Sequence, residues 1–483
     1  MNANFFFVSE SKWTRAFLLL LVLTLISSCT GRNGSESTSA GQAWSQNDLE
    51  QVLETWRRES GIPGVVVGIS QSNQAKIIIT SGVSSLQEET PISEHAQFRI
   101  ASIAKTFIAA EILKLSAQDK VKMDAPISDY LSDVPFGDKV TVRQLLSHRS
   151  GYFDPARDDP NFIPAIAKDM NRLWTWQEVL NQAYGHPLYF EPGTGYDYSD
   201  TNYLLLGLLI KHVTGQSLGD VLTADFINPL QLKHTLYETL NTDLAQTNLV
   251  HGYAENPLNG QIEDILASPQ SALVTVSPNI ISNAPDLLKW SRALYGRDAG
   301  ALGHELQSEM LTFDEMSPYG LGVFKSNTSM GISYGHGGET AGYQSLMQYF
   351  PAQDLSIVIL ANMGFLQSDL NGLHQSLLNV LYSTSATMEI DRLMADLSSN
   401  VPALRKDAIV ALGRSGHAAE KAIPSLILIL ETDPSAENRK EAALALGLLG
   451  RNSEPAKQAL MDAARDSNEA VRQAAQLALS VLK

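Results

Sequence analysis

The sequence predicts an α/β (α+β) protein that ends in a short helical repeat. Two β-rich regions, residues 65–80 and 321–360, flank a stretch whose apolar spacing and punctuation are mainly helical. Beyond residue 388 a sequence pattern recurs at offsets of 34 and 33 residues, a period typical of stacked helix pairs. With 483 residues, 44% of them hydrophobic and 18% charged, the chain has room for two or three globular domains.

The formal net charge of the chain is −17 at pH 7. No block of Lys and Arg compensates for it, so we expect neither nucleic acid nor an anionic membrane surface as a partner. The charge identifies no substrate. The sequence also lacks the His-x-His and His-Glu-x-x-His spacings of zinc sites, so it predicts no metal site.

Residues 1–28 have the organisation of an export signal. Two basic residues precede an eleven-residue apolar run, Ala16–Ile26, that is too short to span a bilayer as a stable helix. The only cysteine of the chain, Cys29, comes directly after two serines. The tetrapeptide Ile26-Ser27-Ser28-Cys29 resembles the lipobox of bacterial lipoproteins, which implies cleavage before Cys29 and lipidation of its sulfur. The alternative is a plain secretory signal with an incidental cysteine.

The lipobox implies an exported lipoprotein held at a membrane of a bacterial cell envelope, facing the periplasm or the cell surface. Residues 29–44, rich in Gly and Ser, are expected to form a flexible tether between the lipid anchor and the first domain. With Cys29 lipidated, no cysteine remains for an intramolecular disulfide, so an oxidising compartment is permitted but not indicated.

The first folded elements are a helix and a hairpin. Apolar spacing from Asn47 to Arg58 predicts a helix that ends at Gly61-Ile62-Pro63. Two runs of β-forming residues follow, Val65–Ser70 and Ala75–Thr80. A short Gln/Ser/Asn turn joins the two runs, so we expect a β-hairpin.

The stretch Arg99–Phe107 places a hydroxyl and an amine three residues apart, at Ser102 and Lys105, before apolar residues at helical spacing. On a helix the two side chains lie on one face, and an amine that burial keeps unprotonated can take the proton of a serine. The pair alone is a weak signal, because Ser-x-x-Lys also occurs by accident at Ser9–Lys12. An ordinary amphipathic helix start is the alternative.

Two polar loops interrupt the helical stretch. His148, within Leu145–Gly151, has no carboxylate or cysteine near it in a recognisable order, so we interpret it as a structural histidine. The second loop, Phe190–Tyr203, combines Pro and Gly with several tyrosines and carboxylates. It is either a structural loop whose polar groups are all satisfied or a site. In a site, a tyrosine held near an ammonium can ionise at a lower pH and serve as a base.

β character returns after Tyr319. The runs are Leu321–Phe324, Ile332–Gly335, Gly342–Phe350 and Leu355–Leu360. Between the second and third runs lies His336-Gly337-Gly338-Glu339. Glycines beside a strand let another backbone or a ligand approach closely. A phosphate-binding loop is disfavoured, because no helix that begins with Gly-Lys-Ser/Thr follows.

Three motifs are more specific together than any one of them. Ser102-x-x-Lys105, Tyr198-Ser199-Asp200 and His336-Gly337-Gly338 occur in the order of the three motifs of the serine β-lactamase/penicillin-binding superfamily. Over residues 45–382 the chain most resembles the branch of class C β-lactamases, D-alanyl-D-alanine carboxypeptidases and esterases. Further similarity lies in Leu145–Gly151, Pro192-Gly193-Thr194, Tyr319–Gly322 and Gly335–Gly338.

The resemblance implies a five-stranded antiparallel sheet flanked by helices, with an inserted all-α subdomain. Early and late strands would share the sheet, and the site would lie in the cleft between the sheet and the subdomain. We therefore expect a lipoprotein signal peptide at 1–28, a tether at 29–44, a β-lactamase-like serine hydrolase domain at 45–382 and a repeat domain at 388–483.

The resemblance also implies acyl transfer through a Ser102 ester, with Lys105 and Tyr198 as general base and acid. The backbone N–H groups of Ser102 and of Glu339, which follows Gly338, would form the oxyanion hole. This chemistry needs no metal and no organic cofactor. The expected substrate is a small-molecule or peptide acyl donor.

Two expected substrate-contacting residues depart from the common family pattern. Asp200 stands where many relatives carry asparagine, and His336 stands where β-lactamases usually carry lysine. An aspartate near Lys105 would favour the ammonium form and repel a substrate carboxylate, and a neutral histidine attracts such a carboxylate less than lysine does. We therefore expect an ester or D-alanyl peptide type substrate, with β-lactam hydrolysis as the alternative.

The last ninety-six residues, 388–483, repeat a helical pattern. Leu404–Gly413 recurs as Asn438–Gly447 and again as Val471–Leu479. The expected partner helices are Ile390–Leu397, Ala422–Leu430 and Lys457–Ala464, with Pro402, Pro424 and Pro434 near helix ends. The pattern resembles a HEAT-like α-solenoid of three helix pairs, at the short end of the HEAT period.

The apolar stripe of these helices is expected to form the core between stacked pairs, and a protein partner could dock on the repeats. The rival to an enzyme is therefore a non-catalytic, membrane-anchored ligand sensor or scaffold that uses the HEAT-like repeats. The joint presence of Ser102, Lys105 and Tyr198 counts against this rival.

Overall fold

The structure is a computed structural model that describes residues 45–71, 75–168, 174–239, 241–256, 259–265, 279–314, 317–364, 370–451 and 453–482. The expected signal peptide, Cys29, the tether and the tip of the first hairpin at 72–74 lie outside the described residues. Within these ranges, no helix has the length and apolarity that crossing a membrane requires.

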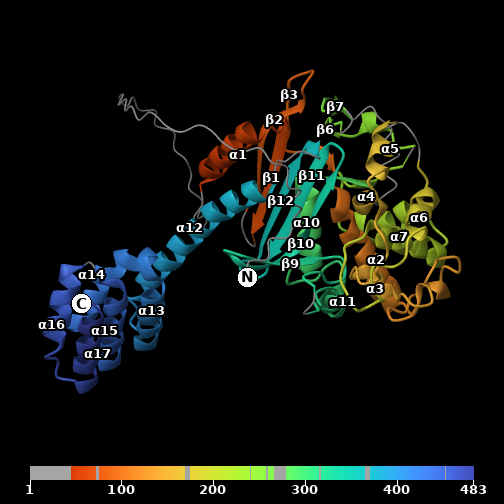
Figure 1. Cartoon of the computed structure of the whole chain (residues 1–483). Coiled ribbons are helices and arrows are strands. Elements are labelled where there is room, and N and C mark those ends of the chain that lie inside the picture. Colours follow the sequence, from red (N-terminus) through yellow and green to blue (C-terminus); the bar gives the residue numbers. More distant parts are fainter. Residues whose placement is uncertain are drawn as a thin grey trace. The chain divides into compact units, whose positions relative to one another are not determined.

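An antiparallel sheet of seven strands, in the order β3-β2-β1-β12-β11-β10-β9, forms the centre of the first domain (Figure 1). Its strands are β1 (Gly64–Gln71), β2 (Ile77–Ser85), β3 (Thr90–Pro91), β9 (Phe324–Thr328), β10 (Gly331–Thr340), β11 (Tyr343–Phe350) and β12 (Leu355–Ala361). The early and late strands meet where β1 pairs with β12, as in the pair Val67↔Ile359. The sheet has seven strands rather than the expected five, and the five longest match predicted runs. The predicted run Leu321–Phe324 is wrong except for its last residue, because the edge strand β9 begins at Phe324. The short edge strand β3 was not predicted.

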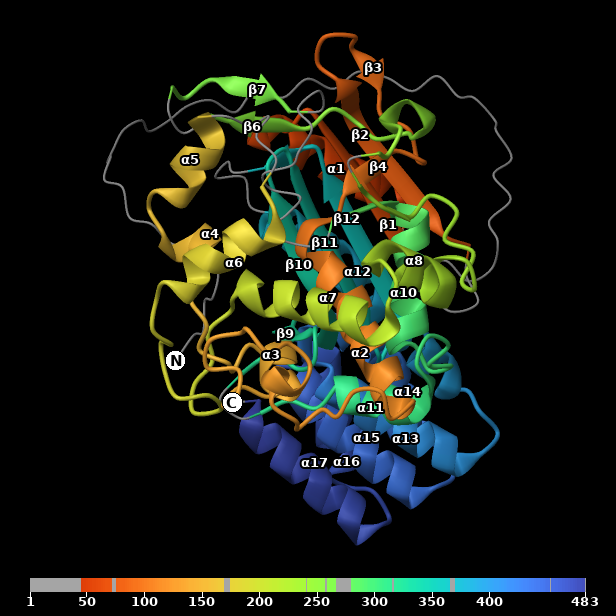
Figure 2. The ribbon, with the colours of Figure 1, turned by 90° about the vertical axis from the view of Figure 1, so that its right-hand side faces the viewer.

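Helices cover both faces of the sheet. Side chains alternate between the two faces along β1, and nearly all of them are buried, so each face packs against helices. Val65, Val67 and Ile69 belong to the core beneath α1 (Gln46–Ser60) and the first turns of α12 (Leu370–Asp396). On the other face, Gly68 leaves room for α10 (Ala284–Tyr295), since a Cβ there would lie 3.0 Å from the Leu288 side chain. Figure 2 shows α10, α2 (Ala104–Ala117) and α7 (Asp200–Thr214) in front of the sheet.

The inserted region is mainly helical. Its helices are α2 (Ala104–Ala117), α3 (Val142–Leu146), α4 (Pro155–Asp158), α5 (Phe162–Lys168), α6 (Trp176–Tyr184), α7 (Asp200–Thr214), α8 (Leu218–Leu222), α10 and α11 (Gly303–Met310). It is not purely helical, because β4 (Gln97–Arg99), β8 (Ile280–Asn283) and β5 (Leu236–Tyr237) form a small sheet. Another small sheet joins β13 (Met363–Gly364), β6 (Tyr253–Glu255) and β7 (Ile262–Asp264). Strands of two to four residues are too short to give a period-2 signal, so the sequence did not predict them.

The C-terminal region is a set of stacked helices. They are α13 (Pro402–Arg414), α14 (Ile423–Thr432), α15 (Ala436–Leu449), α16 (Glu454–Ala463) and α17 (Glu469–Val481), with a 3₁₀ segment at Gly416–Ala422. The expected helix Ile390–Leu397 is the last part of α12, whose earlier leucines belong to the first domain's core. The composition boundary near Ser383–Met388 therefore falls inside one continuous helix.

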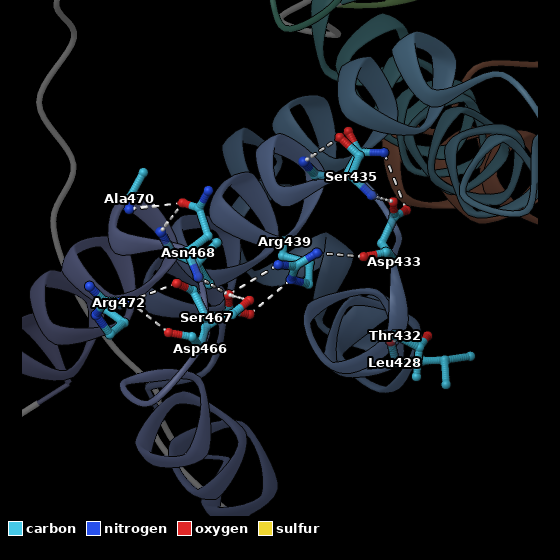
Figure 3. Close-up of polar contacts among 12 residues, drawn as sticks. Leu428, Thr432, Asp433, Ser435, Arg439, Asp466, Ser467, Asn468, Ala470 and Arg472 are labelled. Carbon is cyan, nitrogen blue, oxygen red and sulfur yellow. Dashed lines mark hydrogen bonds and ion pairs between the residues drawn. The ribbon is translucent and has the colours of Figure 1, made fainter.

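Arginines at equivalent positions of the repeat tie successive helix pairs together (Figure 3). Arg439 donates from Nε and Nη2 to the Asp466 carboxylate, at 2.8 and 3.0 Å, and from Nη1 to the Asp433 carbonyl at 2.8 Å. One repeat earlier, Arg405 binds the Asp433 carboxylate in the same way, at 2.7 and 2.9 Å. Within the described residues, Arg472 contacts only the carbonyl oxygens of Asp466 and Ser467. A bond from Nη1 to a carbonyl oxygen is thus common to all three copies, and the first two arginines add a bidentate pair with an aspartate.

Candidate active site

Ser102 lies in a 3₁₀ turn, Ala101–Ile103, directly before α2. The sequence predicts that Ser102 opens the helix, and the structure places it two residues before α2, in the tighter 3₁₀ coil. Ile103 and Phe107 are fully buried and anchor this junction in the core. Ala101 has φ 47°, in the left-handed region that favours glycine, so the residue before Ser102 is held in a strained conformation.

Lys105, on the first turn of α2, is fully buried beneath Ser102. Its Nζ lies 2.9 Å from Ser102 Oγ and 2.6 Å from Asp200 Oδ1. Burial lowers the pKa of Lys105, but the Asp200 carboxylate and the Tyr198 phenol outweigh burial and raise this pKa above its usual value. Lys105 is therefore an ammonium in the resting site.

Tyr198 joins the same group from the loop before α7. Lys105 Nζ lies 5.1 Å from the centre of the Tyr198 ring, and the phenol shares hydrogen bonds with Lys105 and Ser102. Burial raises the pKa of Tyr198, and the Lys105 charge opposes that rise. The hydroxyl, amine and phenol that the sequence singled out thus meet in space, although Tyr198 is 96 residues beyond Ser102.

Asp200 opens α7 and is the second partner of Lys105, with 20% of its side chain exposed. Its backbone N–H donates to the carboxylate of Asp154 at 3.0 Å. Burial and the nearby Asp200 charge raise the pKa of Asp154 to about 7. No local sequence pattern marks Asp154, because its link to Asp200 runs through a backbone amide 46 residues away.

His336 points from β10 toward the same group, with its ring centre 6.1 Å from that of Tyr198. Its Nδ1 lies 2.5 Å from the carbonyl oxygen of Gly337, which can only accept, so Nδ1 carries the hydrogen. Nε2 then accepts from the Tyr319 hydroxyl at 2.9 Å. Burial and the Lys105 charge lower the pKa of His336 to about 3, so the imidazole is neutral.

The His-Gly-Gly-Glu motif lies within strand β10, whereas the sequence predicts it between two strands. Gly338 pairs with Ser345, and Glu339 with Gln344, on β11. A Cβ on Gly338 would lie 2.8 Å from Ser102 N and 2.5 Å from the Ile100 carbonyl oxygen. Glycine is therefore needed for β10 to pass this close to the Ser102 turn, and its poor β propensity hid the strand from sequence analysis.

His148 is fully buried beside Tyr198 and, like Tyr319, supports the site from behind, with its ring centre 4.1 Å from that of Tyr198. Its imidazole hydrogen-bonds to Ser199 and Asn202 rather than to Ser102 or Lys105, in agreement with its structural interpretation. Throughout the described part of the chain, no group of three or more His, Cys, Asp or Glu side chains has the arrangement of a metal site.

Two different protein-family models match the N-terminal domain and the C-terminal repeats of this chain. A family model described as Beta-lactamase matches residues 47–378, and a model described as HEAT repeats matches residues 390–480. The chain belongs to the beta-lactamase family. The fold is that of the serine hydrolases of this family, which include penicillin-binding proteins and amidases, and HEAT repeats follow it.

Two curated relatives cover the family region. The chain is 26% identical over 330 residues to "Protein flp" of Staphylococcus aureus (strain MW2). This alignment covers 66% of the present chain and 63% of that protein. It is 24% identical to "Penicillin-binding protein 4*" of Bacillus subtilis (strain 168), over 65% of this chain and 71% of the relative. The match thus leaves over a third of the Staphylococcus protein uncovered.

Similar solved structures include two amide-cleaving enzymes. A D-stereospecific amidohydrolase from a Streptomyces species is 27% identical with a TM-score of 0.61, covering 69% of this chain and 98% of that one. The D-amino acid amidase of Ochrobactrum anthropi SV3, solved with L-phenylalanine amide, is 25% identical with a TM-score of 0.62, covering 70% and 99%. A penicillin-binding protein from Bacillus halodurans, 24% identical with a TM-score of 0.57 over 68% and 98%, shares the fold.

Proposed function

We propose that this protein is a serine hydrolase that works by acyl transfer through a Ser102 acyl-enzyme. The proposal rests on the contacts among three side chains. Lys105 Nζ lies 2.9 Å from Ser102 Oγ, and the Tyr198 phenol hydrogen-bonds to Lys105 and to Ser102. A serine is a weak nucleophile unless a neighbouring group takes its proton. Tyr198, once ionised beside the Lys105 ammonium, supplies such a group, and this corrects the expectation that burial keeps Lys105 unprotonated. A cluster with only a structural role would not need all three side chains.

Lys105 and Tyr198 share the proton transfers. The step starts from sites in which Tyr198 is ionised, its phenolate stabilised by the Lys105 ammonium. As Ser102 Oγ attacks the acyl carbon, its proton passes to this phenolate. The bond between the acyl carbon and the leaving oxygen or nitrogen then breaks, and the leaving group takes that proton. Water repeats the sequence on the Ser102 ester: it gives a proton to the same pair, adds to the acyl carbon and releases Ser102.

The N–H groups of Ser102 and Glu339 form the oxyanion hole in this proposal. Support comes from the close approach of β10 to the Ser102 turn, which only glycine at position 338 permits. Removing one oxyanion donor costs about 3–4 kcal/mol of transition-state stabilisation in other hydrolases.

The preferred substrate is an ester or an amide or D-alanyl peptide bond, rather than a β-lactam. Lys105 is already paired with Asp200 at 2.6 Å, and His336 is neutral, so neither offers a free positive charge to a carboxylate on the substrate. Two of the similar structures are a D-stereospecific amidohydrolase and a D-amino acid amidase. Acyl donors without a carboxylate next to the scissile bond are therefore expected to react fastest.

The test compares turnover of a p-nitrophenyl ester, a D-amino acid amide, a D-Ala-D-Ala peptide and a chromogenic cephalosporin. We expect turnover in the order ester, amide, peptide and cephalosporin, all lost in Ser102→Ala and all retained in the surface control Ser132→Ala. Fast cephalosporin turnover with little ester cleavage would assign a β-lactamase instead. Failure of an acyl-serine probe to label the wild-type protein would favour the non-catalytic scaffold.

We also propose that Cys29 carries the lipid anchor that holds the protein at the cell envelope, and that the HEAT repeats dock a protein partner. The support is the lipobox resemblance and the repeat match at 390–480. Cys29→Ala is expected to move the full-length protein from the membrane fraction to the soluble fraction of the cell envelope. Unchanged membrane association would remove the anchor proposal.

A further inference from the structure

The segment that follows α3 runs behind the loop that carries Tyr198. His148 lies at the start of this segment, fully buried, with φ 55°. Its carbonyl accepts a hydrogen bond from the N–H of Asp197, the residue before Tyr198, at 3.0 Å. Its imidazole Nδ1 accepts from the N–H of Ser199, the residue after Tyr198, at 3.1 Å. His148 therefore binds the backbone on both sides of Tyr198.

The hydrogen bonds also fix the tautomer of the imidazole. Nδ1 accepts a second hydrogen bond, from Nδ2 of Asn202 on the first turn of α7, at 3.0 Å. Two donors aimed at one nitrogen require a lone pair there, so the hydrogen lies on Nε2. Nε2 is buried, and the residues described around it supply no hydrogen-bond partner.

The ring faces a set of aromatic side chains instead. Its centre lies 4.1 Å from that of Tyr198 and 4.6 Å from that of Tyr319, whose hydroxyl binds His336. Burial, followed by the positive charge of Lys105, lowers the pKa of His148 well below its usual value. A neutral ring can thus lie against Tyr198 without placing a second cation beside Lys105.

We propose that His148 is a positioning residue, whose Nδ1 acceptor and ring hold the Tyr198 phenol against Ser102 and Lys105. The inference rests on the proposed function, since it assigns His148 to the reaction that Tyr198 serves. A histidine that only filled the core would need neither the two bonds to the Tyr198 loop nor a ring contact with the phenol. Position matters here because a misplacement of about 1 Å at a catalytic group costs on the order of 100-fold in rate.

Two variants separate the acceptor from the ring. His148→Asn keeps an acceptor at the place of Nδ1 and tolerates a positive φ, whereas His148→Phe keeps the ring and loses the acceptor. The control is His186→Phe, because His186 is exposed and stacks on Phe153 at 3.8 Å. We expect His148→Phe to lower kcat on the p-nitrophenyl ester by about 100-fold with KM unchanged. His148→Asn is expected to restore most of kcat, and His186→Phe to leave it unchanged.

A crystal structure of His148→Phe provides a readout that does not depend on activity. We expect the Tyr198 hydroxyl to leave hydrogen-bond range of Ser102, while Ser102 and Lys105 stay in place. The inference is overturned if Tyr198 keeps its position in His148→Phe, if His148→Asn is as slow as His148→Phe, or if kcat per folded molecule is unchanged while only Tm falls. A wild-type protein that never forms an acyl-enzyme would instead remove the proposed function, and the crystal structure would still decide what His148 positions.

Discussion

Replacing Asp200 with asparagine tests how the charge of the site is balanced. The Asp200 carboxylate lies 2.6 Å from the buried Lys105 ammonium and is the main reason that the pKa of Lys105 is raised. An opposite charge at such a distance shifts a pKa by about 1–3 units. Asp200→Asn removes that shift and leaves burial, which lowers the pKa of Lys105, as the dominant effect.

In Asp200→Asn, Lys105 is therefore expected to lose its proton at a lower pH than in the wild-type protein. The alkaline limb of the pH profile of kcat/KM on the p-nitrophenyl ester should move down by about 1–3 pH units. The same variant should turn over the cephalosporin relatively faster, because a charge that repels its carboxylate is gone.

The control for net charge is Asp124→Asn, since Asp124 pairs with Arg143 at the surface of the helical region and is 76% exposed. It should leave the profile unchanged. If Asp200→Asn has the wild-type pH profile and the wild-type preference between ester and cephalosporin, then Asp200 does not set the charge of Lys105, and this part of the mechanism is wrong.

Three further predictions follow from other contacts. Gly338→Ala should abolish acylation, because the new Cβ would lie 2.8 Å from Ser102 N. Circular dichroism should show that the variant is still folded. Near-normal labelling by an acyl-serine probe would contradict the close approach of β10. Asp154 has a folded-state pKa of about 7, above its unfolded value of 3.8, so its contribution to stability is full below pH 3.8 and is lost as the pH rises through 7. That loss is on the order of 4 kcal/mol of unfolding free energy. Asp154→Asn should remove it, so urea unfolding of the variant should depend less on pH. If the variant has the same pH dependence as wild type, Asp154 is ionised without a cost to stability. Arg439→Leu should destabilise the repeats by about 1–2 kcal/mol, because the partly buried Asp466 carboxylate loses both of its bonds to the guanidinium, at 2.8 and 3.0 Å. Amide exchange should become faster in α15 and α17, and exchange as slow as in wild type would mean that the pair is dispensable.

The sequence predicted most accurately what depends on local pattern. The helix Asn47–Arg58, the strands of the first hairpin and the repeated helices all have a period that a short window contains, and the structure has them within a few residues. The ordered motifs pointed to Ser102, Lys105 and Tyr198, and the structure brings these three together.

What the sequence could not supply depends on contacts between distant segments. Asp154 matters through a bond to the backbone of Asp200, and His148 through bonds to Ser199 and Asn202, and neither leaves a local pattern. Gly338 belongs to a strand because β10 must pass close to Ser102, although glycine disfavours strands. The composition boundary near residue 388 did not reveal that α12 serves two cores, since a helix can change partners without changing its own pattern.

The central claim is that Ser102 becomes covalently acylated. Mass spectrometry of the protein quenched during turnover of a p-nitrophenyl ester measures this directly. We predict an added acyl mass on the peptide that contains Ser102, absent in Ser102→Ala and slower to form in Tyr198→Phe. Two results would contradict the account: ester turnover with no acyl mass on that peptide, and ester turnover that persists in Ser102→Ala.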